Sequence, residues 1–117
     1  MSIASIRFFM EPMRSLGFAD IAADPGDYKS IGSSVDHPVR MYELHNFTDV
    51  NLVFSIDGVD DHFPLEPDGY KVIDIATNKS NDNGWYLGQG TYFYVKPLDP
   101  LVVPTSGGVY LCIAYGN

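Results

Sequence analysis

The sequence is poor in cysteine and in basic residues. It has one cysteine, Cys112, among 117 residues, so a disulfide within the chain is excluded and no disulfide framework is expected. Seven residues are Lys or Arg and fifteen are Asp or Glu, which gives a net charge of −8 and an isoelectric point near 4.4. Nucleic-acid binding needs clustered basic side chains, and an anionic membrane surface repels an acidic chain. We therefore expect neither nucleic acid nor a membrane as a partner.

Long apolar runs are also missing. No stretch approaches the roughly 20 apolar residues of a membrane-spanning helix. The opening segment, MSIASIRFFMEPMRS, lacks the basic start and the apolar centre of a signal peptide, so we expect no export signal. Asn46-Phe47-Thr48 matches the N-glycosylation pattern, and without an export signal we interpret the match as accidental.

Apolar residues recur at every second position in several short segments. This alternation is typical of β-strands with one buried face, and the segments are rich in the β-branched and aromatic residues that strands prefer. The predicted strands cover residues 39–47, 49–56, 70–77, 90–96 and 109–115. The predicted core residues are Phe54, Ile73, Phe93, Leu111 and Ile113. No window longer than about ten residues has a clean helical period.

Turn-forming residues separate these segments. Asp57-Gly58 and Pro67-Asp68-Gly69 favour tight turns, with a positive φ expected at Gly58. Short strands at about ten-residue spacing favour a sandwich or barrel. We predict one all-β domain over residues 1–117, an antiparallel β-sandwich of about six to eight strands. Residues 1–27 form either an N-terminal arm or the first strand, and Ser2–Met10 either joins its own core or adds a strand to a partner sheet.

An acidic segment is the first candidate for chemistry. Asp57, Asp60 and Asp61 stand beside His62, and calcium sites use several such oxygen ligands. The segment lacks the ligand spacing of an EF-hand, and Asp and Gly are what a turn requires. The three histidines, at positions 37, 45 and 62, are not spaced as zinc ligands. We therefore interpret the segment as a turn and expect no metal.

No catalytic motif is present. Cys112 lies inside an apolar strand, where a thiol is usually inert, and Ser106 lacks the pattern of a nucleophile elbow. Glu43, Glu66 and Asp74 single out no acid–base pair in an acidic chain. Gly88-Gln89-Gly90 is followed by no lysine and so does not indicate a phosphate loop. We predict no catalytic or cofactor-binding residues and no enzyme activity.

Aromatic residues cluster late in the chain, at Trp85, Tyr86, Tyr92, Phe93 and Tyr94. Exposed rings on a β-sandwich stack on sugars, which would make the protein a carbohydrate-binding module for host attachment. The alternative is that inward rings fill the core and outward tyrosines serve a protein interface, where they are enriched. We favour the second interpretation.

An ordered set of segments resembles small virion proteins of tailed bacteriophages. The segments are YKSIG (28–32), HPVR (37–40), NFTDVNLVFSIDGVDDHF (46–63), GYKVIDIATNK (69–79), GQGTYFYVK (88–96) and PTSGGVYLCIAYG (104–116). They span about three-quarters of the chain, and the first 27 residues match less well.

The resemblance implies a structural protein of the virion with a sandwich that is jelly-roll-like. It favours a decoration or cement protein that binds the major capsid protein and stabilises the head shell, with a neck, tail or fibre-base component as the alternative. It also implies residence in the virion after assembly in the bacterial cytoplasm. Because exposed sheet edges and two-fold axes often coincide, we expect a homo-oligomer, a dimer rather than a trimer.

Overall fold

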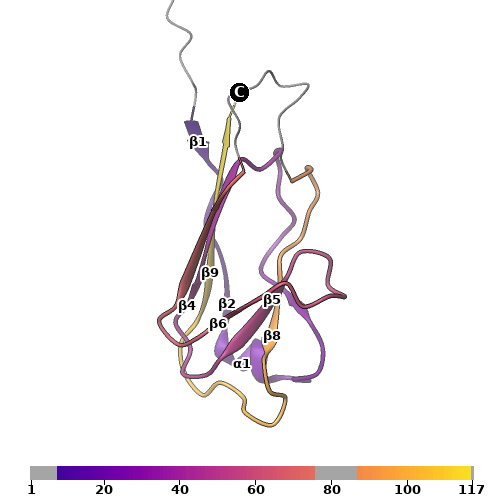
Figure 1. Ribbon diagram of the computed structural model, residues 1–117, viewed down its shortest axis with the longest axis vertical. Coiled ribbons are helices and arrows are strands. Elements are labelled where there is room, and N and C mark those ends of the chain that lie inside the picture. Colours follow the sequence, from indigo (N-terminus) through magenta and orange to yellow (C-terminus); the bar gives the residue numbers. More distant parts are fainter. Residues whose placement is uncertain (1–7, 76–86, 117) are drawn as a thin grey trace, which may run out of the picture.

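The computed structural model describes residues 8–75 and 87–116 (Figure 1). In these residues the chain forms nine short strands, all paired antiparallel, and one short helix. The elements are β1 (Phe8–Met10), β2 (Arg14–Gly17), α1 (Phe18–Ala22), β3 (Lys29–Ser30), β4 (Met41–Asn46), β5 (Leu52–Ser55), β6 (Phe63–Leu65), β7 (Tyr70–Asp74), β8 (Tyr94–Pro97) and β9 (Gly108–Gly116). In the part of the chain described, no helix is long and apolar enough to cross a membrane.

The strands form two sheets that face each other (Figure 1). Sheet I has the order β1-β9-β4-β7, with β2 also paired to β9, and sheet II has the order β3-β8-β5-β6. The predicted all-β antiparallel class is confirmed. The nine strands exceed the predicted six to eight, partly because Pro12 divides the N-terminal segment into β1 and β2 on the same neighbour, β9.

The apolar core lies between the sheets and takes side chains from both. Its largest fully buried members include Phe54 and Phe93 from the side of sheet II and Leu111 and Ile113 from β9. These four confirm the predicted core. Ile73, the fifth predicted core residue, is half-buried at the rim, because β7 is an edge strand.

Strand β5 departs from the predicted pattern of one buried face. Leu52 and Phe54 face the core as expected, but Val53 and Ser55 on the other side are also buried. Val53 lies between Pro64 of β6 and Lys96 of β8. The hydroxyl of Ser55 donates to Asp57 and accepts the N–H of Gly58, so the following turn lies against it. The alternation prediction failed here because strands β6 and β8 flank Val53 and the following turn lies against Ser55, and the period of β5 itself shows neither.

Residues 8–22 are part of the sandwich. Strands β1 and β2 pair with the two halves of β9, and Ile21 of α1 is fully buried in the core. The backbone of Met10 is thus placed in the chain's own sheet. Most of Ser2–Met10, the segment considered for exchange with a partner, lies outside the described residues.

Two glycines adopt the backbone that their turns require. Gly58 has φ of 75°, as predicted, and Gly107, which leads into β9, has φ of 80°. A side chain at Gly107 would place its Cβ 1.8 Å from the carbonyl oxygen of Phe47. The start of β9 therefore touches the end of β4 at a point where only glycine fits.

Asn46, the asparagine of the glycosylation pattern, is completely buried. Its amide donates to the carbonyls of Val50 and Leu65, each at 3.0 Å. Its side-chain oxygen accepts the N–H of Thr48 at 2.9 Å and the hydroxyl of Thr48 at 2.6 Å. Asn46 therefore locks the connection between the two sheets and is not on the surface of the folded chain.

Candidate functional site

The outward side of sheet I carries a group of rings that we call the aromatic row, formed by His45, Phe47, Tyr70 and Tyr110. The alternation of β4 and β9 turns Leu44 and Leu111 into the core and leaves these rings outside. Cross-strand pairing sets His45 opposite Tyr70 on one side and opposite Tyr110 on the other. Three strands thus bring the rings together.

The rings of the row pack against each other. The His45 ring lies 5.4 Å from Phe47 and 5.8 Å from Tyr70, both stacked, with interplanar angles of 7° and 24°. Tyr110 meets Phe47 edge to face at 5.5 Å. Phe47 and Tyr70 nevertheless remain 50% and 64% exposed. The row is an ordered apolar surface that still offers area to a partner.

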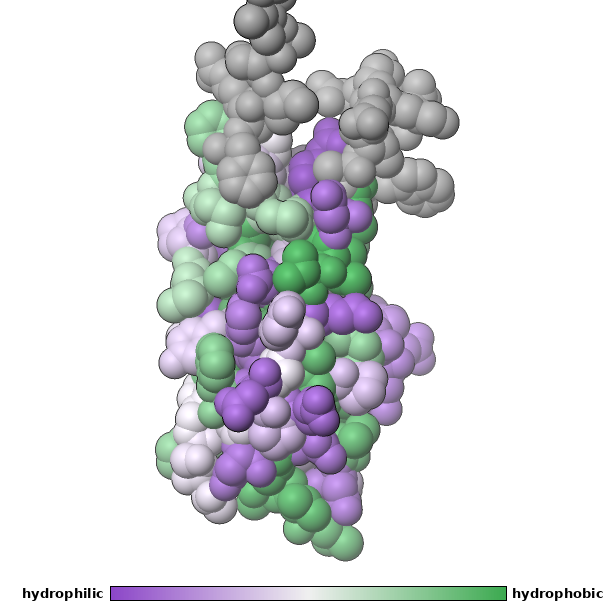
Figure 2. Space-filling model, turned by 60° about the vertical axis from the view of Figure 1, so that its left-hand side comes forward, coloured by the Kyte–Doolittle hydropathy of each residue, from purple (hydrophilic) through white to green (hydrophobic). Residues whose placement is uncertain are grey.

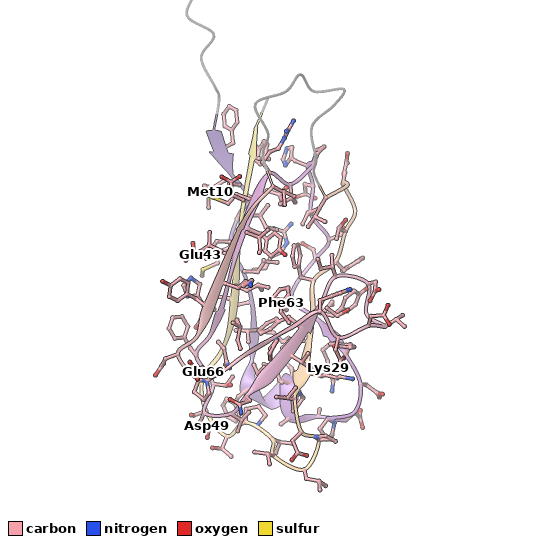
Figure 3. All side chains as sticks on the ribbon, in the orientation of Figure 1. Met10, Lys29, Glu43, Asp49, Phe63 and Glu66 are labelled. Atoms are coloured by element: carbon pink, nitrogen blue, oxygen red, sulfur yellow. The ribbon has the colours of Figure 1, made fainter. Side chains whose placement is uncertain are left out.

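Apolar side chains extend this surface. Met10, Met13 and Val72 are all about half exposed, at 53%, 60% and 46%. Figure 2, turned towards the side of sheet I, shows pale and green groups over it with purple side chains between them. Figure 3 shows Met10 and Glu43 on this outward side. We call the aromatic row and these flanking side chains the outer face of sheet I.

One acid–base pair lies on this face. The Glu43 carboxylate is 2.5 Å from Nε2 of His45, two residues along β4. Cys112 lies opposite Glu43 on β9 and is half-buried. Burial, and then the nearby Glu43 carboxylate, raise the pKa of the Cys112 thiol. Because the thiolate is the reactive form, the raised pKa lowers the fraction of Cys112 that is reactive at neutral pH.

The acidic segment forms a self-contained turn after β5. Asp57, Asp60 and His62 bring possible ligand atoms within 4.8 Å of one another, and all three are exposed. One oxygen of Asp57 accepts the N–H groups of Val59 at 2.8 Å and Asp60 at 2.9 Å. These bonds, with that of Ser55, lower the pKa of Asp57 to about 2. Asp57 therefore supports its own turn, in agreement with a turn interpretation of the segment.

The same turn is fixed to the outward side of sheet II by its third aspartate. Asp61 accepts a hydrogen bond from the hydroxyl of Tyr28 and lies 3.6 Å from Nζ of Lys96. The Lys96 ammonium also sits 4.4 Å from the centre of the Tyr28 ring. Burial, and then the hydrogen bond to Asp61, raise the pKa of Tyr28. These contacts hold the loop against sheet II.

A buried ionic cluster joins the N-terminal strands to the loop after β3. Glu11 is 5% exposed and lies 2.8 Å from Arg14 and 2.8 Å from Nδ1 of His37. Arg14 also donates to the carbonyls of Ser33 and Ser34, each at 2.8 Å. Burial alone would raise the pKa of Glu11, but hydrogen bonds from His37, the Asp36 N–H and Arg14 outweigh it and lower the pKa. Sequence reasoning did not single out this cluster, because the pair Glu11 and Arg14 is far along the chain from the loop that carries His37.

The remaining candidates from the sequence do not assemble. His37 stacks on Tyr115 with ring centres 3.6 Å apart, while His45 lies in the aromatic row and His62 in the acidic turn. Ser106 is exposed in the loop before β9. In the described residues, the one group of at least three potential metal ligands is the exposed turn already described. Glu66 and Asp74 belong to no such group in that part of the chain.

The aromatic cluster considered for sugar binding is divided. Phe93 is buried in the core, whereas Tyr92 is 43% exposed and packs beside Tyr94 at 6.1 Å. Trp85 and Tyr86 lie outside the described residues. The sequence analysis did not predict the aromatic row on sheet I, because its members come from three strands and the pattern along one strand does not show which strands are neighbours.

The chain matches no protein-family model, and no curated protein matches it.

Proposed function

We propose that the protein is a non-enzymatic structural component of a tailed-bacteriophage virion that docks on other virion proteins through the outer face of sheet I. The observation that carries the proposal is the exposure of Phe47 and Tyr70 in an ordered aromatic row. Exposed contiguous apolar surface marks interaction sites, and aromatic residues and methionine are enriched at protein interfaces. The resemblance to phage virion proteins supplies the biological setting.

Within that class we propose a jelly-roll-like decoration or cement protein that binds the major capsid protein. A small sandwich that binds assembled shell subunits, and binds released subunits less well, stabilises the lattice by mass action. The net charge of −8 favours a neutral or basic partner surface. A protein partner is favoured over a sugar because the row continues into the exposed apolar side chains of Met10, Met13 and Val72.

The first test is the amount of this protein in purified particles, measured by quantitative mass spectrometry against the major shell protein. A decoration protein is expected in near-stoichiometric amounts. A small fixed count would place it in the neck, tail or fibre base instead. Its absence from particles would overturn the virion proposal.

A second test addresses the face itself. The double variant Phe47→Ala, Tyr70→Ala should lose binding to undecorated particles while keeping its circular dichroism spectrum, because both side chains are half exposed or more. Tyr92→Ala is the matched control, since Tyr92 is 43% exposed and precedes β8 of sheet II. Equal binding by the double variant and the control would contradict docking through sheet I.

A further inference from the structure

Edge strand β7 is the longest uninterrupted sheet edge among the described residues. Strand β3 has two residues, and β6 has three with Pro64 at its centre. The edge formed by β1 and β2 is interrupted by Pro12. Strand β7 pairs with β4 on one side, runs for five residues and contains no proline. Native proteins usually protect such edges, because an open edge pairs with another strand.

Among the described residues, β4 is the one strand that pairs with β7. The N–H of Ile75 donates to Arg40 at 2.7 Å, and the carbonyl of Gly69 accepts from Asn46 at 2.9 Å. In an antiparallel ladder the residues that bond a given neighbour alternate. Odd-numbered residues of β7 therefore bond β4, and the N–H and C=O groups of Tyr70 and Val72 point away from it.

We propose that two copies of this chain pair through β7, antiparallel, with Val72 on the two-fold axis. This register sets Lys71 of one copy opposite Ile73 of the second copy. It also sets Tyr70 opposite Asp74 of the second copy. Val72 is 46% exposed and meets its own equivalent, an apolar pair across the axis. Sheet I then continues from one copy into the other.

Charge selects this register over its neighbours. Centring the pair on Lys71 would place two ammonium groups directly opposite each other, which is destabilising. Centring it on Ile73 would set apolar Val72 against the Asp74 carboxylate. The Val72-centred register keeps like charges apart and matches apolar with apolar at the axis.

Shape complements the same register. It places Ile75 of the second copy opposite Gly69, which has no side chain. Gly69 lines an open groove of about 440 Å³ together with Leu65, Tyr70 and Leu98. A half-buried isoleucine facing this groove from the second copy adds apolar contact at both ends of the paired strands.

The test uses opposite charges at the axis. Sedimentation equilibrium should give twice the 13.0 kDa chain mass for the wild type. Val72→Lys and Val72→Glu should each give the single-chain mass, because each sets like charges opposite on the axis. An equimolar mixture of the two should restore the double mass. Val102→Lys is the control, since Val102 is 51% exposed in the loop before β9 and should leave the dimer intact.

A disulfide experiment tests the register. In a Cys112→Ser background, Val72→Cys should give a covalent dimer in a glutathione redox buffer, because directly paired Cα atoms lie within bonding range. Lys71→Cys should give none, since its equivalents are diagonal and too far apart. A monomeric wild type, a mixture that stays monomeric, or crosslinking at position 71 in place of 72 would each overturn the proposal. Because free protein is used, the result is independent of binding to any virion.

Discussion

At the scale of single residues, the four hydrogen bonds of Asn46 hold the turn between the sheets. Asn46→Ala would leave buried carbonyl and N–H groups without their partner, and we expect it to lower the free energy of unfolding by about 1–3 kcal/mol. Urea denaturation followed by circular dichroism measures the change. Asn51→Ala, at an exposed position, is the control and should change it by less than about 0.5 kcal/mol. Similar losses for both variants would contradict the role of Asn46.

Glu11 links stability to acid pH. Its pKa in the folded chain lies below the ordinary value of 4.5, so the stabilisation is present above that value and is lost as the pH falls through the lowered pKa. We expect the wild type to lose more stability than Glu11→Gln between about pH 7 and about pH 3, measured by urea denaturation at each pH.

The comparison isolates Glu11 because the other carboxylates with lowered pKa values, among them Asp57, are the same in both proteins. The variant should also be less stable near neutral pH, since it removes the 2.8 Å ion pair of the buried Arg14, whose other carboxylate neighbour, Asp36, lies 3.9 Å away. Parallel pH curves for the two proteins would refute the assignment.

At the scale of elements, the turn into β9 depends on close backbone contact. An alanine at Gly107 meets both the strain of positive φ and the carbonyl oxygen of Phe47, whereas Gly90, with φ of 91°, has open space around it. We expect Gly90→Ala to cost about 1–2 kcal/mol, from backbone strain alone, and Gly107→Ala to cost clearly more. Thermal and urea unfolding of both variants measure the difference. Equal costs would show that the turn relaxes away from Phe47.

The sequence predicts a strand well where the burial of its side chains follows the strand's own alternation of apolar and polar residues. Strands β4 and β9 were predicted because Leu44 and Leu111 face the core within regular alternation. The burial of Val53 was not predicted, since its cover comes from strands β6 and β8. The aromatic row was missed for the same reason, because it depends on β4 lying between β7 and β9. Local periodicity does not encode strand order.

At the scale of the whole molecule, the two sheets share one core, so we expect them to unfold together. Side chains from both, such as Phe54 and Ile113, belong to one cluster. Far-ultraviolet and tyrosine near-ultraviolet circular dichroism should give coincident urea transitions. If the β7 dimer forms, the midpoint should rise with protein concentration in the wild type and not in Val72→Lys. Separate transitions for the two signals would contradict a shared core.

The rate at which Cys112 is alkylated can measure how accessible the outward side of sheet I is. It is the one thiol of the chain, and it lies on β9 at the outward side of sheet I, opposite Glu43. Alkylation therefore adds at most one group per chain, and its raised pKa makes labelling slow except at alkaline pH. A partner seated over the aromatic row would slow labelling further. The rate of alkylation, measured from the mass of the intact protein over time, would thus show how much of this face is covered in a particle that carries no substitution.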